Sequence, residues 1–161
     1  MSYQTMNAAL KYAKLGWHVF PCAEKGKAPL TPHGFKDATT DPKQISAWWS
    51  KWLDANIGVA TGKISGITVL DIDFDPEKGI NGFETLKQLG IGLPSTVMQR
   101  TPRGGLHLFF KYDPRVGNTA NKLGPGLDTR NDGGYVVVAP SVGSNQSTYA
   151  WEDGFTPWDM N

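Results

Sequence analysis

Apolar residues recur at helical spacing in two segments of the first third of the chain. In the first segment, four of them share one face of a helix that Gly16 can end: Met6, Ala9, Leu10 and Ala13. The second segment begins with Asp41 as a cap, a proline at the first helical position and Gln44 to complete a capping box. Its apolar stripe consists of Ile45, Trp48, Trp49 and Trp52. We predict two helices and interpret the tryptophan stripe as core, because such a face is more often buried than used to stack bases.

Short apolar runs separated by turn residues fill the rest of the chain. They predict strands at residues 17–20, 57–61, 67–74, 96–99, 106–112, 135–139 and 148–151. A capping box at Asn81 and Glu84 predicts a short helix that ends at Gly90. Its inward residues are expected to be Phe83, Leu86 and Leu89. This order predicts an α/β (α+β) fold, with helices mainly on one side of a mixed sheet and a core like that of ferredoxin or an RNA-recognition motif.

The length of 161 residues suits one domain with a buried core. We expect an N-terminal α/β unit over about residues 1–62 and a catalytic core over about residues 63–161. The chain has no apolar run of about 18 residues and no signal pattern, so we expect a cytoplasmic protein without a membrane partner. The single cysteine, Cys22, excludes an internal disulfide and a cysteine-based zinc cluster.

The net charge of +1 gives no overall reason to expect nucleic-acid binding. One local stretch is basic, however, with five cations against Asp113 alone: Arg100, Arg103, Lys111, Arg115 and Lys122. Such a stretch is usually a solvated face. It is nevertheless the part of the chain that could follow the phosphates of a nucleic acid.

Two carboxylates interrupt an apolar strand at Asp71 and Asp73. Because strand side chains alternate, both carboxylates point to the same face, with α-carbons about 6.5 to 7 Å apart. That spacing lets them converge on one divalent cation or on a pair of cations. A strand end with solvated acids is the ordinary interpretation of such a pair. The apolar neighbours Ile72 and Phe74 make it less attractive here, because unpaired charge beside them is costly.

Two later blocks add polar residues beside glycine turns. In the first block, a turn that includes Gly105 precedes a strand in which His107 lies on the face opposite Leu106 and Leu108. An imidazole beside a glycine turn can reach a phosphate. In the second block, Asp128 and Arg130 are two residues apart and precede an apolar strand. They could supply a third carboxylate and a cation for a triphosphate, or simply form a surface salt bridge.

The order of the blocks resembles the bifunctional primase-polymerase (prim-pol) domain of the archaeo-eukaryotic primase superfamily, found in plasmids, phages and other mobile elements. The blocks that carry the resemblance are residues 25–29, 34–41, 48–49, 56–62, 70–73, 104–107, 127–130 and 134–141. Each block is weak alone, whereas the ordered set is specific. Together they cover nearly the whole chain.

The resemblance implies a site for metal ions and a nucleotide. It implies that Asp71, Asp73 and Asp128 bind two catalytic Mg²⁺ or Mn²⁺ ions and that His107 contacts the nucleotide's phosphates. Many relatives carry serine where this chain has Gly105. We further expect nucleotide contacts from Arg130, Lys27, Gly105 and Ser141, and template contacts from the basic residues between 100 and 122.

The working hypothesis is template-directed nucleotidyl transfer by a DNA primase/polymerase, with single-stranded or primed DNA and dNTPs or NTPs as partners. The segment at Gly58–Ser65 fails the Walker A spacing, which indicates a helicase in trans or in a missing C-terminal region of a longer replication protein. One alternative is a metal-dependent nuclease or replication initiator, but an initiator needs paired histidines where only His107 is suitable. Another is a non-catalytic nucleic-acid-binding module, which leaves the three carboxylates unexplained.

Overall fold

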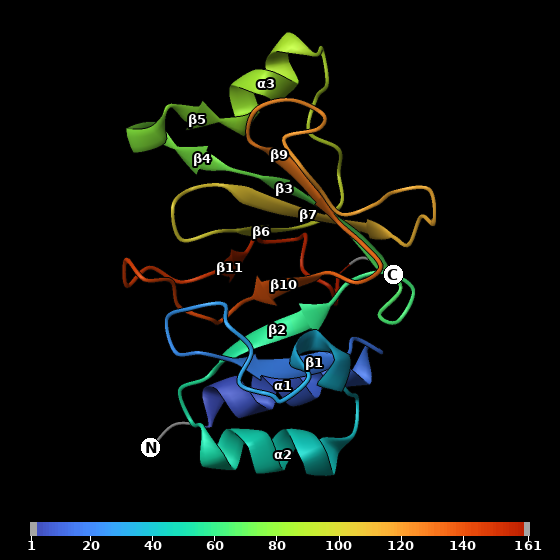
Figure 1. Ribbon diagram of the computed structural model, residues 1–161, viewed down its shortest axis with the longest axis vertical. Helices are drawn as coiled ribbons and strands as arrows, with labels where there is room; N and C mark the ends of the chain where they lie inside the picture. Colours follow the sequence, from blue (N-terminus) through green and yellow to red (C-terminus); the bar gives the residue numbers. More distant parts are fainter. Residues whose placement is uncertain (1–2, 160–161) are drawn as a thin grey trace.

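Two antiparallel sheets lie one above the other in the computed structural model, which describes residues 3–159 (Figure 1). The smaller sheet has the order β1-β2-β10, from Val19–Cys22, Asn56–Ala60 and Tyr135–Val138. The larger sheet has the order β11-β6-β7-β3-β9-β8. Its strands are β3 (Ile67–Ile72), β6 (Val97–Arg100), β7 (Leu106–Lys111), β8 (Thr119–Ala120), β9 (Leu127–Arg130) and β11 (Ala150–Trp151). The predicted α+β class is confirmed. All of these strand pairs are antiparallel and form two sheets, where one mixed sheet was predicted.

Both predicted N-terminal helices are present, as α1 (Gln4–Lys14) and α2 (Pro42–Lys51), and they pack beside the smaller sheet. Asp41 caps α2, because its carboxylate accepts a hydrogen bond of 3.0 Å from the N–H of Lys43. Ile45 and Trp49 are fully buried, which confirms the tryptophan stripe as core. The first strand begins two residues later than predicted, at Val19. The short 3₁₀ turn η1 (Gly34–Asp37) interrupts the loop between β1 and α2.

The third helix, α3 (Gly82–Gln88), begins at the predicted cap, where the Asn81 side chain accepts a bond of 3.2 Å from the N–H of Glu84. It follows β4 (Phe74–Asp75), the 3₁₀ turn η2 (Pro76–Lys78) and β5 (Ile80–Asn81). Leu86 is buried as predicted, but the inward placement of Leu89 is wrong, since that residue is 51% exposed. Leu89 is already the cap residue beyond the last helical turn, so it no longer follows the buried face. No helix between residues 3 and 159 is long and apolar enough to span a membrane.

The four central strands of the larger sheet have the ferredoxin-like order, β6-β7-β3-β9, with α3 between β3 and β6. The strand β9 was not predicted, because its alternation of Leu127 and Thr129 with Asp128 and Arg130 is too short to separate from a turn. It pairs with β3 along its whole length. The short strand β8, also not predicted, pairs with its outer edge.

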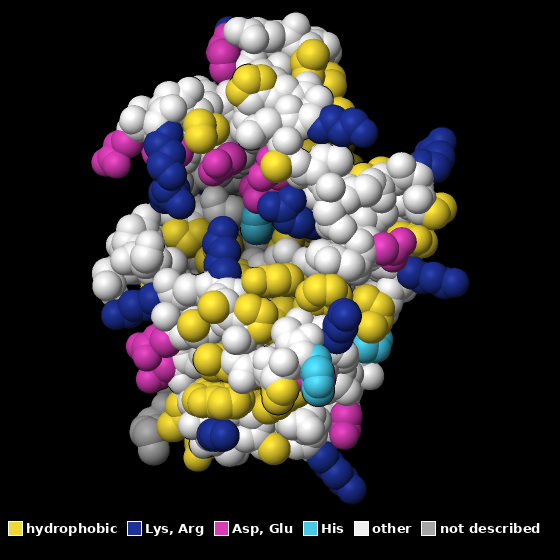
Figure 2. All heavy atoms as spheres, viewed as in Figure 1, with side chains coloured by type: hydrophobic (Ala, Val, Ile, Leu, Met, Phe, Trp, Pro, Cys, Tyr) yellow, Lys and Arg dark blue, Asp and Glu magenta, His cyan; other side chains and the backbone are white. Residues whose placement is uncertain are grey.

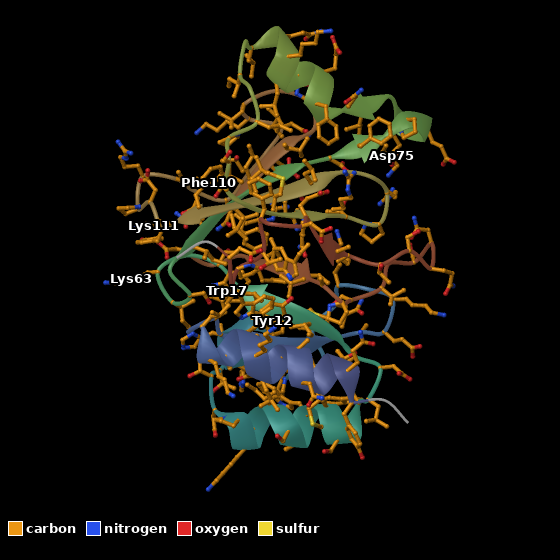
Figure 3. All side chains as sticks on the ribbon, turned by 180° about the vertical axis from the view of Figure 1, so that it is seen from behind. Tyr12, Trp17, Lys63, Asp75, Phe110 and Lys111 are labelled. Carbon is orange, nitrogen blue, oxygen red and sulfur yellow. The ribbon has the colours of Figure 1, made fainter. Side chains whose placement is uncertain are left out.

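The two faces of the larger sheet pack against different partners. One face, with Leu108 and Leu127, forms a core with Leu86 of α3. The opposite face, with Val69 and Phe109, packs in the core that also holds the smaller sheet and helices α1 and α2. Figure 3 shows Tyr12 and Trp17 inside this second core. The polar residues of the candidate site follow Val69 along that second face, so they lie where the two sheets separate.

The strand β10 connects the two halves of the chain, since it comes late in the sequence and pairs with β2 of the N-terminal half. Tyr12 of α1 strengthens the connection, because its hydroxyl donates to the carbonyl of Ala139 and accepts a bond of 2.8 Å from the indole N–H of Trp151. The division of the chain near residue 62 stays a prediction. The smaller sheet combines residues from both sides of that point.

Candidate active site

Four polar residues form a row across the larger sheet. In the strand register, Asp71 of β3 lies opposite Asp128 of β9 on one side and opposite His107 of β7 on the other. His107 in turn lies opposite Gln99 of β6. Directly opposed residues share one face of a sheet and have neighbouring side chains. Pairing between distant segments therefore brings together the carboxylates and the histidine that the sequence singled out.

His107 is held in the row from both sides and is only 5% exposed. Its Nδ1 lies 2.9 Å from the amide nitrogen of Gln99, and its Nε2 lies 3.5 Å from a carboxylate oxygen of Asp71. The predicted placement of His107 opposite to the face of Leu106 and Leu108 is confirmed. The ring edge that carries Nε2 is thus the one directed toward Asp71.

Asp71 is surrounded by cationic groups. Burial alone would raise the pKa of its carboxyl, but the charge and hydrogen bond of His107, with the charges of Lys27 and Arg130, outweigh burial and hold the pKa below its ordinary value. The carboxylate is therefore ionised at neutral pH. It supplies a fixed negative charge at the centre of the row.

A cavity of about 380 Å³ opens beside the row, between the two sheets. Its volume is in the range of small-molecule sites. The charged and imidazole groups that line it are Lys27, Asp71, His107 and Arg130. Aromatic rings supply another part of the wall, from Phe35, Tyr135 and Tyr149. Figure 2 shows acidic, basic and histidine side chains gathered at a hollow midway along the molecule.

Two backbone contacts place Lys27 at this cavity, although it comes from the loop between β1 and α2. The hydroxyl of Tyr135 donates to the carbonyl of Lys27 at 2.8 Å, and the Asn56 side chain donates to the carbonyl of Gly26 at 2.9 Å. Arg130 is fixed by bonds from its guanidinium to two carbonyls, of which that of Thr129 is 3.0 Å away. The two cations therefore approach the cavity from different parts of the fold, Lys27 from the loop after β1 and Arg130 from β9.

The carboxylates fit a divalent cation in chemistry and in strand position. Asp71 and Asp73 both line a smaller cavity of about 90 Å³ beside the first one, and oxygen donors of this kind suit Mg²⁺ and Mn²⁺. Asp128 has other partners: it accepts a bond of 2.9 Å from the N–H of Asn121 and lies 3.7 Å from Arg130. Within residues 3–159, no three His, Cys, Asp or Glu side chains are arranged to hold one ion. Asp71 and Asp73 are the pair that already shares a cavity.

Two predicted nucleotide contacts have structural partners instead. Ser141 is 2% exposed, and its hydroxyl accepts a bond of 2.8 Å from the N–H of Ile57, which ties the end of β10 to β2. Gly105 packs against β3 so closely that a Cβ atom there would lie less than 3.0 Å from the carbonyl oxygen of Ile72. Neither residue lines the cavity beside His107. The structure therefore does not bring these two residues to the site.

The predicted basic face is divided between distant places. Arg103 lines the smaller cavity and pairs with Asp75 at 2.9 Å, and Arg100 of β6 pairs with Glu152, the residue after β11. Lys111 lies at the other end of β7, and Figure 3 shows it on the opposite side of the molecule from Asp75.

The remaining two cations of the stretch lie in loops. Arg115 pairs with Asp113 at 2.7 Å, and Lys122 is exposed between β8 and β9. Only Arg100 and Arg103 belong to the turn region between β6 and β7, at the end of the sheet that carries Asp73.

Sequence reasoning missed Gln99 and Tyr149. Gln99 falls in a predicted strand without any motif, and its place opposite His107 depends on the β6–β7 register. The Tyr149 ring lies 6.2 Å from the His107 ring, and burial, followed by the charge of Asp71, raises the pKa of its hydroxyl to about 12. Tyr149 is therefore an uncharged wall of the cavity. Tyr149 falls in the predicted strand at residues 148–151, where no motif signals this role.

Comparison with known proteins identifies the family of the chain. Residues 9–159 match the family model described as bifunctional DNA primase/polymerase, N-terminal. No curated protein matches the chain. The family match spans both sheets and every residue of the row, from Gln99 to Asp128. The chain therefore belongs to the family of bifunctional DNA primase/polymerase N-terminal domains.

Proposed function

We propose that the chain is a nucleotidyltransferase that extends DNA on a template, as the primase/polymerase of a plasmid, phage or other mobile element. One observation carries the proposal: His107 and Asp71 line the cavity that Lys27 and Arg130 also line, and Asp128 lies opposite Asp71 in the strand register. Cationic groups for a triphosphate and carboxylates for metal ions thus meet in one place. Nucleotidyl transfer needs this combination, because the protein contributes positioning and charge stabilisation.

The incoming nucleotide would place its triphosphate between Lys27 and Arg130. The two cations line the same cavity, one from the loop after β1 and one from β9, so a polyphosphate can bridge them and gain charge-assisted hydrogen bonds on both sides. His107 would donate from Nε2 to a phosphate oxygen, because its Nδ1 already has Gln99 as a partner. The aromatic part of the wall leaves an apolar surface for the rest of the nucleotide.

The carboxylates of Asp71, Asp73 and Asp128 would hold Mg²⁺ or Mn²⁺. When bound, these ions supply activation of the primer's 3′ hydroxyl and neutralisation of the departing pyrophosphate. The low pKa of Asp71 supports this assignment, because the carboxyl is ionised and ready to bind over the whole neutral range. That this site binds two such ions is part of the proposal.

The template would approach from the end of the sheet that carries Asp73. Arg103 borders the smaller cavity there, and Arg100 lies on the adjoining strand. Because few cations lie at this end, we expect modest affinity for single-stranded or primed DNA that falls with salt. A helicase, in trans or in a C-terminal region, would supply strand opening in the cytoplasm of the host cell.

Primer extension tests the proposal directly. The purified chain is given a primed or an unprimed template of known sequence, four nucleotides, and Mg²⁺ or Mn²⁺, with a chelator as control. We expect products whose sequence follows the template and whose formation stops with the chelator. Products that ignore the template would contradict template direction, and degradation of the DNA would favour the nuclease alternative.

A further inference from the structure

Gln99 is a buried, fully hydrogen-bonded polar side chain next to the candidate site. It is fully buried on β6, and its amide has three partners. The amide oxygen accepts a bond of 3.0 Å from the N–H of Ala139, and the amide nitrogen lies 2.8 Å from the carbonyl of Val137. The same nitrogen lies 2.9 Å from Nδ1 of His107. The side chain therefore connects β10 of the smaller sheet with the histidine of the larger one.

The two partners on β10 determine which end of the amide is oxygen. A backbone N–H can only donate, so the atom facing Ala139 must be the oxygen. A carbonyl can only accept, so the atom facing Val137 must be the NH₂ group. Both requirements agree, and they exclude the flipped amide without any reference to the histidine.

This orientation determines the proton position on the neutral His107 ring. The NH₂ group of Gln99 donates, so Nδ1 must accept with its lone pair. The ring proton then lies on Nε2, the nitrogen that faces Asp71. Gln99 itself does not line the cavity, so it acts through His107 alone.

We propose that Gln99 is a positioning residue that holds the His107 ring in one orientation, with Nδ1 unprotonated and Nε2–H presented to the cavity. The part concerning nucleotide use rests on the proposed function, because it takes a phosphate oxygen as the acceptor of Nε2–H. The orientation of the ring and the position of its proton do not depend on the proposed function. Buried groups that fix the tautomer of a functional histidine work in this way in other protein sites.

Two substitutions of Gln99 change its hydrogen bonds to different extents. Gln99→Glu keeps the size and the acceptor for Ala139, but it places a carboxylate oxygen where the NH₂ group faced both Nδ1 and the carbonyl of Val137. We expect the ring proton to move to Nδ1, which then donates to Glu. Gln99→Leu removes all three bonds and should leave the ring with mixed tautomers. Val138→Ala is the matched control, because it removes buried contacts on β10 and leaves the partners of Gln99 in place.

The direct measurement is NMR of the ring nitrogens in the chain labelled with ¹⁵N-histidine, at about pH 8, above the ordinary pKa of histidine. The chain has three histidines, so His18→Asn and His33→Asn assign the signals of His107. We expect an unprotonated Nδ1 in the wild type and in Val138→Ala, and a protonated Nδ1 in Gln99→Glu. In primer extension, Gln99→Leu should raise the nucleotide KM about tenfold, as the loss of one hydrogen bond does, without changing the affinity for primed template.

Several outcomes would overturn the proposal. A wild-type ring with its proton on Nδ1 would do so, as would a Gln99→Leu variant with the wild-type ring spectrum and nucleotide KM. If Val138→Ala had the same effects as the Gln99 substitutions, those effects would be due to lost stability instead. If Gln99→Leu does not fold, the ring spectra of the wild type and of Gln99→Glu still test the proposal. A wild-type chain without primer extension would refute the proposed function, while the ring spectrum would still decide the role of Gln99.

Discussion

Gly105→Ser tests how the turn between β6 and β7 positions His107. The family resemblance in the sequence suggests serine at this position, so the change could be expected to add a hydroxyl for phosphate. In this chain a side chain there would instead meet the backbone of β3, with its Cβ less than 3.0 Å from the carbonyl oxygen of Ile72. The Thr101 hydroxyl would lie 3.0 Å away on another side. The substitution is therefore expected to impair both folding and nucleotide use.

The size of the effect follows from what can move. Ordinary contacts of a Cβ atom begin near 3.4 Å, and the carbonyl oxygen that it meets belongs to a sheet strand rather than a flexible side chain. The turn must therefore shift by roughly an ångström. Overpacking of this kind costs about 1 to 3 kcal/mol. For a chain of this length, that cost lowers the melting temperature by about 2 to 12 °C.

Two quantities are measured: the melting temperature in thermal unfolding and the nucleotide KM in primer extension. Gly92→Ser is the matched control. A Cβ atom at Gly92 would have no neighbour within 4 Å, and its φ is not in the left-handed region. Gly92→Ser should melt like the wild type, whereas Gly105→Ser should melt lower and raise the KM. An unchanged melting temperature for Gly105→Ser, or a lower KM, would refute the packing argument.

Three further predictions concern the site and its support. Arg130→Ala should weaken nucleotide use by roughly 10 to 1000 fold, equivalent to about 1.4 to 4 kcal/mol, with little change in template affinity measured by fluorescence anisotropy; a collapse of template affinity alone would place Arg130 in the template groove. Ser141→Ala should lower the free energy of unfolding by about 1 to 3 kcal/mol, because the buried N–H of Ile57 loses its acceptor, and should leave the nucleotide KM unchanged. For Asp71, whose folded pKa lies below the unfolded value of about 3.9, the ionised carboxyl contributes stability above that value and loses it as the pH falls through the folded pKa. The stability difference between wild type and Asp71→Asn in denaturant melts should therefore shrink as the pH falls from 7 to below about 3, and a constant difference would contradict the pKa assignment.

Local chemistry made much of the fold predictable. The helix α2 follows from its cap at Asp41 and from the spacing of Ile45 and Trp49, because both signals depend on residues close in sequence. Asp71 and His107 could be singled out because each interrupts an apolar strand. Strand alternation predicted part of their arrangement, because it places Asp71 and Asp73 on one face.

The parts that could not be predicted depend on register between distant strands. The contact of Gln99 with His107 requires the β6–β7 pairing, and Lys27 reaches the cavity only because β1, β2 and β10 form one sheet. Ser141 shows the opposite case, since its family block suggested a nucleotide contact while the fold directs its hydroxyl to β2. A sequence pattern gives the type of a residue, whereas only tertiary pairing determines its partner.

The most direct test of the account is the rate of nucleotide incorporation by a variant in which both Asp71 and Asp73 are replaced by alanine. The rate is measured on a primed template with saturating Mn²⁺, beside Asp153→Ala, an acidic residue outside both cavities that border the row. We expect the double variant to keep the far-ultraviolet circular dichroism spectrum of the wild type and to lose incorporation. Asp153→Ala should extend the primer normally. Incorporation at the wild-type rate by the double variant would contradict the assignment of this cavity as the active site.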